Sequence, residues 1–370
     1  MAARGKGRVS RRSFCRHLLA AAGALALPAR ERAVAGSEAS PCPELAPGVV
    51  RWIVPAPPGG GYDQYARLIQ PFCERRLQRT IVIENISGAG TILGACRLRD
   101  ARPDGRTLGL LNAGALLMGQ LIRDSAAPHP IDDFTLLGRI SRTPQIWATA
   151  GDSPLKTMAD VVAEARRRPL VFGITEFGAN NALNAAVGAR LLDLRHEIVP
   201  GYQGSRGLTL AAIRGEVDVV PLTLTARIAA IEAGDLQPLL QMASEPITDH
   251  PRLAPVPCIG GAEGVAVARA RATGRDLEQT RADAEALALL LNSGRLAAAP
   301  HGLPSGLTAC LRRQLAAALA DPACSEAATA AHLVLEFGDA PFVRADLEQA
   351  LAGAERFVPW LEAARRKVRG

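Results

Sequence analysis

The sequence predicts an α/β protein built around a largely parallel sheet. Short β-branched segments alternate with alanine-rich amphipathic segments along most of the 370 residues, which is typical of parallel strands connected by helices. A glycine-rich turn follows each of the first two apolar segments, where a strand would pass into a helix. Hydrophobic residues make up 48% of the chain, so the cores of two domains are expected.

The first glycine-rich turn follows the apolar segment 49–53, which predicts a strand. It reads Pro57-Pro58-Gly59-Gly60-Gly61, and its glycines permit positive φ and leave no side chain in the way of a ligand. Asp63 stands where the next helix begins and can cap its free N–H groups. The turn therefore predicts a cradle of N–H donors at a positive helix end, which suits a carboxylate or a phosphate.

The second glycine-rich turn, residues 85–94, follows a predicted strand at 80–85 and opens a predicted helix at 94–100. Together the two turns indicate a binding cleft, although a tight structural turn would also explain this second one. The glycine spacing also fits a dinucleotide site. The next strand, 107–111, ends without the acidic residue that a ribose requires, which argues against a cofactor site. Because of the glycine spacing, an enzyme with a nicotinamide or flavin cofactor is kept as the alternative.

The alternation of strands and helices continues into a second domain. Segment 145–150 predicts a strand that crosses into this domain, and 236–243 predicts the strand that returns. The segments between them predict helix 153–168, strand 170–173, helix 180–192, strand 197–200, helix 209–213, strand 217–220 and helix 226–233.

The C-terminal part predicts mostly helices. The charged, alanine-rich segment 262–285 predicts a solvated insertion with a helix, and 286–296 fits either a strand or the end of that helix. Segments 307–319 and 345–368 predict amphipathic helices.

The positive charge of the chain is concentrated in residues 1–35. They hold eight of the 43 basic residues and one of the 36 acidic residues, so the remainder is electrically balanced. This balance gives no reason to expect nucleic acid or an anionic membrane as a partner. The basic segment 10–14, the short apolar run 18–27 and Ala33-Val34-Ala35 predict an export signal similar to the twin-arginine type, cleaved near Ala35.

Six cysteines follow the leader, and none forms a C-x-x-C pair. Bridges such as Cys73–Cys96 or Cys310–Cys324 fit an oxidising compartment, but isolated buried thiols are preferred for this set. The histidines are scattered, so no metal site is expected. Residues 204–207 lack the first glycine of a nucleophile elbow. The chain is therefore expected to be a binding protein without a metal or cofactor, and not an enzyme.

The chain resembles the substrate-binding receptors of tripartite tricarboxylate transporters, also called Bug-type periplasmic proteins, over about residues 48–365. The resemblance depends on the order and spacing of several short motifs. These are Pro57 to Gly61 with Asp63, Glu84-Asn85, Gly88-Ala89-Gly90, Pro103 to Leu108, Val199 to Gly204, Gly215 to Asp218, Ala233 to Leu236, His250-Pro251, Val256-Pro257 and Ala299 to Pro304.

This resemblance implies a periplasmic-binding-protein-like venus flytrap, with two α/β lobes joined by crossover strands. Lobe one would comprise 48–145 and 244–370, and lobe two 146–243, after the signal 1–35 and a flexible lead-in 36–47. The implied function is capture of a small organic carboxylate in the periplasm by a monomer that delivers it to membrane permease subunits. A periplasmic sensory ligand-binding protein is the alternative.

The resemblance also implies a set of ligand-binding residues on four loops. These are Pro58, Gly59, Gly60 and Asp63, with Asp63 orienting the turn; Ala89, Gly90 and Thr91; Asn112 and Gly114; and Thr175, Glu176, Asn180, Tyr202, Gln203 and Gly204. Glu176 would either face the cleft and favour an amine or amide on the ligand, or be an exposed loop acid. Tyr202 would either contact the ligand or pack at the hinge. Loops 175–181 and 221–223 depart from the usual family pattern, which predicts a different ligand preference in lobe two.

Overall fold

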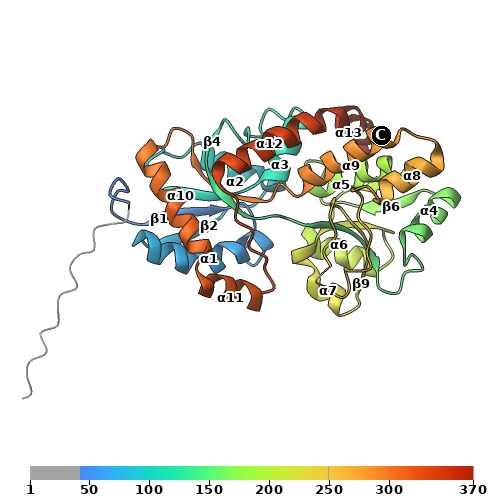
Figure 1. The fold of residues 1–370 in the computed structure, drawn as a ribbon, viewed down its shortest axis with the longest axis horizontal. Coiled ribbons are helices and arrows are strands. Elements are labelled where there is room, and N and C mark those ends of the chain that lie inside the picture. The colour runs from blue at the N-terminus through green and yellow to red at the C-terminus, as the bar shows by residue number, and fades with distance from the viewer. Residues whose placement is uncertain (1–41, 249, 370) are drawn as a thin grey trace, which may run out of the picture. The chain divides into compact units, whose positions relative to one another are not determined.

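A five-stranded, mostly parallel sheet combines four strands from the first part of the chain with one from the C-terminal part (Figure 1). The computed structural model describes residues 42–248 and 250–369. The sheet order is β2-β1-β3-β10-β4, and only β10 runs antiparallel to its neighbours. Its strands are β1 (Val50–Val54), β2 (Ile81–Asn85), β3 (Thr107–Asn112), β4 (Phe134–Ser141) and β10 (Arg295–Pro300). The predicted parallel sheet is confirmed, but strand β4 was not predicted. Segment 286–296, for which a strand and a helix end were the alternatives, contains the end of one helix at Leu291 and the start of β10 at Arg295.

Alternation along β1 divides the hydrophobic core of this sheet into two layers. Trp52 and Val54 pack on one face with helices α1 (Gly61–Leu77), α10 (Ser305–Leu319) and α11 (Pro322–Ala330). Ile53 points to the other face, where α2 (Ile92–Arg99), α3 (Ala113–Leu121) and α12 (Ala340–Ala354) complete a second core. Successive strand residues face opposite sides, so both faces of the sheet are covered.

The register of β1 against β2 determines where the two glycine-rich turns lie. The strands are parallel, and Val54 at the end of β1 pairs with Asn85 at the end of β2. Both turns therefore leave the same edge of the sheet, next to each other. This is the carboxyl edge at which open α/β sheets bind ligands.

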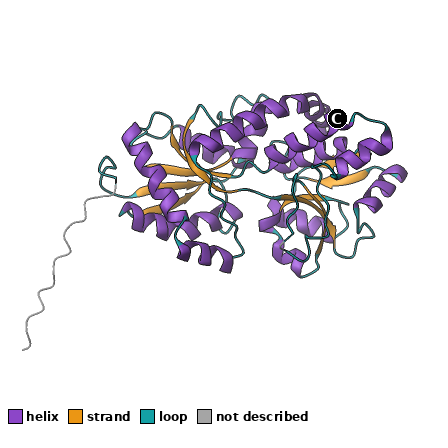
Figure 2. Cartoon of the chain, in the orientation of Figure 1, coloured by secondary structure: helices purple, strands orange, loops and turns teal. Residues whose placement is uncertain are grey.

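The middle of the chain forms two smaller sheets. One is antiparallel, in the order β8-β5-β9, and the other pairs β6 with β7 in parallel. Their strands are β5 (Gln145–Ala150), β6 (Leu170–Gly173), β7 (His196–Val199), β8 (Val220–Thr223) and β9 (Leu236–Gln241). The associated helices are α4 (Met158–Arg167), α5 (Asn180–Leu191), α6 (Gly204–Ile213) and α7 (Ile228–Glu232), with single turns η1 (Ala89–Thr91) and η2 (Leu224–Ala226). Figure 2 shows both groups of strands surrounded by helices.

The C-terminal third differs from the sequence prediction in several places, including helix α11, which was not predicted. Segment 262–285 is not simply solvated, because α8 (Val265–Thr273) buries Ala266 and α9 (Leu277–Leu291) buries Ala284 in the core shared with α5 and α12. The single helix predicted at 345–368 is two, α12 and α13 (Val358–Arg369), separated by η3 (Glu355–Phe357). Pro359 lacks the N–H that a continuous helix would need, which explains the break.

A disulfide joins Cys42 to Cys310 and so ties the segment before β1 to α10. The two pairings suggested by sequence spacing are wrong, because Cys73, Cys96 and Cys324 are free thiols. The bonded residues are 268 positions apart, so spacing could not identify the pair. None of the helices in the described part of the chain combines the length and apolarity that a membrane crossing requires.

Candidate functional site

A cleft of about 1030 Å³ lies between the turns that follow β1, β2 and β3 and the loops around β6, α6 and β8. Its size suits a small organic molecule, since ligand pockets typically measure roughly 300–1,000 Å³. Most of the residues predicted from sequence line it. These are Pro58, Gly59, Gly60, Gly90, Thr91, Asn112, Thr175, Glu176, Asn180, Tyr202, Gln203 and Gly204. Asp63, Ala89 and Gly114 are predicted site residues that are not part of the lining.

Asp63 is buried behind the first turn and holds it in shape. Its carboxylate accepts hydrogen bonds from the Gly59 N–H at 2.8 Å, from Arg67 Nε at 2.8 Å and from Asn85 Nδ2 at 3.0 Å. Burial alone would raise the pKa of Asp63, but these hydrogen bonds outweigh it and lower the pKa. The expected orienting role therefore fits the contacts. The expected capping role is wrong, because Gly60 is the N-cap of α1 and no side chain caps it.

The free N–H donors of the first turn belong to the start of α1. The Gly59 N–H is bound by Asp63, and the Gly60 N–H donates to the Pro57 carbonyl at 3.0 Å. The helix begins at Gly61, and the first N–H groups of a helix have no intrahelical acceptor. The donors that can face an anion are therefore those of the first turn of the helix.

The second turn has four consecutive residues with positive φ. Gly88, Ala89, Gly90 and Thr91 have φ values of 137°, 46°, 61° and 88°. This conformation is strained for a β-branched residue such as Thr91. The Thr91 N–H donates back to the Gly88 carbonyl at 3.0 Å, which closes the turn. The sequence predicted that glycines shape this loop, but gave no sign that Ala89 and Thr91 share their conformation.

A buried arginine that was not predicted lies behind the first turn. Arg295 on β10 stacks on Tyr62 and Tyr65, with its guanidinium carbon 5.0 Å and 4.2 Å from the ring centres. It donates to Ser141 Oγ at 3.1 Å, and it forms an ion pair with no carboxylate among the described residues. A Cβ on Gly61 would lie 3.6 Å from its Nη2. An unbalanced positive charge is thus held close to the start of α1. Burial raises the pKa of Tyr62 to about 12, and Arg295 partly opposes that rise.

The loop after β6 reaches across the cleft to the second and third turns. A Cβ on Gly90 would lie 3.2 Å from Glu176 Oε1, so this exposed carboxylate faces the cleft beside the second turn. A Cβ on Gly114 would lie 2.8 Å from Asn180 Nδ2, which donates to the Leu291 carbonyl at 3.3 Å. Gly114 therefore permits the close approach of Asn180, although it does not line the cleft itself.

Several polar residues of the lining were missed by sequence reasoning. Gln145 on β5 donates to Thr223 Oγ1 at 3.0 Å, and both residues face the cleft. Arg206 on α6 and Arg227 between η2 and α7 add two positive charges. Thr223 ends the segment 221–223, which departs from the family pattern, and Arg227 follows four positions later. No motif marks these residues, because only the fold brings them to one cavity.

Across residues 42–248 and 250–369, no group of three or more histidine, cysteine or acidic side chains is arranged to hold a metal ion. The charged residues of the cleft are Glu176, Arg206 and Arg227, and its other polar groups are amides, hydroxyls, His332 and main-chain N–H groups. Such a lining can hold an organic anion by hydrogen bonds and charge.

Comparison with known proteins gives a family match over more than half of the chain. A family model described as "Tripartite tricarboxylate transporter family receptor" matches residues 65–268. A "UPF0065 protein in the TAR-I ttuE-ttuC' intergenic region" of Agrobacterium vitis is 31% identical over 186 residues, which cover 50% of this chain and 53% of that protein. The chain spans between about half and two thirds of the length of the first curated relatives it matches.

Two solved structures show the fold. A structure titled "R. palustris Rpa4515 with adipate" superposes with a TM-score of 0.67 at 23% identity, covering 85% of this chain and 98% of that one. The periplasmic binding protein BugD superposes with a TM-score of 0.65 at 19% identity, covering 87% and 98%. The chain thus has the fold of periplasmic solute-binding proteins, as the family resemblance implied.

Proposed function

Because the chain belongs to the tripartite tricarboxylate transporter receptor family, we propose that it is an exported receptor that captures a small organic carboxylate for uptake by membrane permease subunits. The observation that carries this proposal is the convergence of two main-chain N–H turns on one cleft, with the Arg295 guanidinium behind the first. A carboxylate can accept hydrogen bonds from both turns at once.

Capture would depend on closure of two lobes around the ligand. We assign 48–145 and 244–370 to lobe one and 146–243 to lobe two, with β5 and the end of β9 as the connection. A ligand that contacts the turns of lobe one and the loops of lobe two stabilises the closed population. Binding and release need no covalent chemistry, and a monomer is sufficient.

Export to the periplasm is part of the same proposal. The twin-arginine-like signal lies in residues 1–35, outside the described residues. The Cys42–Cys310 disulfide supports an oxidising compartment, because disulfides persist mainly in exported proteins. Relatives with the same fold include a protein titled as a periplasmic binding protein.

The test uses a substitution that fills the cleft without changing the backbone. Gly90 has φ 61° and ψ 28°, a conformation that asparagine tolerates, and its missing Cβ points toward Glu176. We expect Gly90→Asn to fold but to bind its best carboxylate at least about tenfold more weakly, which corresponds to roughly 1.4 kcal/mol. Isothermal titration calorimetry of the purified protein against malate, succinate, adipate and citrate measures this.

Gly274 provides a closely matched control. It has φ 67° and ψ 26° at the end of α8, and a Cβ there would meet nothing within 4 Å. Gly274→Asn should therefore bind as the wild type does. The proposed function would be contradicted if native mass spectrometry detected no co-purified acid and calorimetry detected no heat of binding for any acid of the panel. If Gly90→Asn and the wild type bound the best carboxylate of the panel with equal affinity, the second turn would not be part of the binding site.

A further inference from the structure

The cleft has an uneven distribution of charge. Its two arginines, Arg206 and Arg227, lie on the wall formed by α6, β8 and η2, whereas its one carboxylate, Glu176, lies beside Gly90. The glycine-rich turns, which follow β1 and β2, form a separate wall. One wall therefore offers main-chain N–H groups, and the other offers guanidinium groups.

Arg227 carries a charge that the described protein does not neutralise. Its Nε is inaccessible to solvent and has no hydrogen-bond partner among the described residues. Burial lowers the pKa of Arg227, and the nearby positive charge of Arg206 lowers it further. Keeping a half-buried guanidinium without an acid is unfavourable, and an anion placed against it would offset that cost.

The start of α6 adds to the same positive region. This helix spans 10 residues, and Gln203, Gly204, Ser205 and Arg206 at its first turn all line the cleft. A helix N-terminus carries partial positive charge and free N–H groups. An anionic group on this wall would thus meet two guanidinium groups and the helix start together.

We propose that Arg206 and Arg227 form a second anion subsite, which binds the distal carboxylate of a dicarboxylate whose first carboxylate contacts the glycine-rich turns. This deepens the proposed function and rests on it. Arginine suits the role because its planar donors can bind both oxygens of a carboxylate. Arg227 would make the stronger contact, since it is half-buried, while Arg206 is exposed.

The test compares two ligands that differ only at the distal group. Adipate and its monoamide have the same length, but the monoamide lacks the second charge. We expect the wild type to prefer adipate by at least about tenfold, and Arg227→Met to reduce that preference about tenfold. Monoamide affinity should change by no more than about twofold. Arg206→Met should act in the same direction with a smaller effect.

The control and the outcomes separate this inference from the proposed function. Arg271 is exposed on α8 and has no hydrogen bond or ion pair with the described residues, so Arg271→Met makes the same change in net charge outside the cleft. It should leave the preference unchanged. Equal weakening of both ligands by Arg227→Met, or an unchanged preference in both cleft variants, would overturn the subsite while the proposed function stands. A wild type that binds neither ligand would count against both.

Discussion

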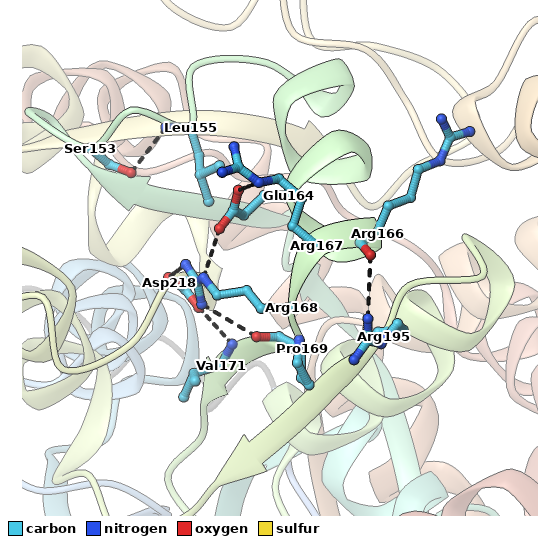
Figure 3. A network of polar contacts seen from close by, with 10 residues as sticks. All are labelled: Ser153, Leu155, Glu164, Arg166, Arg167, Arg168, Pro169, Val171, Arg195 and Asp218. Atoms are coloured by element: carbon cyan, nitrogen blue, oxygen red, sulfur yellow. Dashed lines mark hydrogen bonds and ion pairs between the residues drawn. The ribbon is translucent and has the colours of Figure 1, made fainter.

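Two arginines in the middle of the chain have opposite surroundings. Arg168, at the end of α4, donates to both oxygens of Asp218 at 2.7 Å and to Glu164 at 2.7 Å (Figure 3). These bonds raise its pKa, whereas burial lowers the pKa of Arg227 in the cleft. Arg168 is paired with two carboxylates of the protein, whereas Arg227 is paired with no carboxylate among the described residues. The comparison separates an arginine that holds the fold from one that can bind a ligand.

The cavity beside Arg168 illustrates why size alone does not identify a site. It measures about 740 Å³, and Asp160, Glu164 and Asp218 are among its lining residues. Each of these acids already has a partner, since Asp160 accepts from the Thr157 N–H at 2.8 Å in the capping box of α4. These three paired acids therefore give a ligand little to bind.

The largest effect should follow from removing the acid of the paired group. Asp218 accepts from Arg168 and also from the Val171 N–H at 2.8 Å. Asp218→Ala leaves the Val171 N–H without an acceptor and removes the two-oxygen partner of Arg168, which is half exposed and keeps Glu164, so we expect the free energy of unfolding to fall by about 1–2 kcal/mol. Urea denaturation monitored by circular dichroism measures this. Asp152→Ala is the control, because Asp152 is exposed beside the same cavity.

Carboxylate binding should be unaffected by Asp218→Ala, because Asp218 does not line the ligand cleft. A variant as stable as the wild type, or one with weakened ligand binding and normal stability, would remove the distinction between the two arginines.

The second effect is the acid dependence of the same stabilisation. Burial alone would raise the pKa of Asp218, but hydrogen bonds from Arg168 and Val171 lower it overall. An acid with a lowered folded pKa stabilises the fold above its unfolded pKa, about 3.9, and loses this contribution as pH falls through the folded pKa. The stability difference between wild type and Asp218→Ala should therefore be constant above about pH 5 and shrink below about pH 4. Urea denaturation across this range tests it, and a difference that grows on acidification would contradict it.

Much of the fold was accessible from sequence because it depends on local patterns. The strand and helix alternation located β1, β2, β3, β6 and the start of α5 within a few residues. The turns at 57–61 and 88–91 were visible because glycine and proline restrict the backbone locally. Even Asp218, part of the motif 215–218, was noticed, although its contacts give it a structural role.

The parts that sequence reasoning missed depend on contacts between distant segments. Arg295 reaches the first turn only because β10 pairs with β3 across nearly two hundred residues of intervening chain. The Cys42–Cys310 bond and the placement of Arg227 in the cleft have the same origin. Neither charge nor spacing shows, before folding, which arginine has an acid beside it.

The smallest effect should come from the unpaired arginine itself. Arg227→Met removes a half-buried charge that has no partner among the described residues and keeps most of the side-chain volume. Replacing such a charge by an apolar group is commonly neutral or stabilising, so we expect the free energy of unfolding to rise by between zero and about 1 kcal/mol. Arg168→Met is the matched variant in the paired group, and it should destabilise the protein because Asp218 and Glu164 both lose the arginine from which they accept hydrogen bonds. Urea denaturation of both variants, without added ligand, provides the comparison. If Arg227→Met lost as much stability as Arg168→Met, Arg227 would be held by the fold, and its charge would not be available to a ligand.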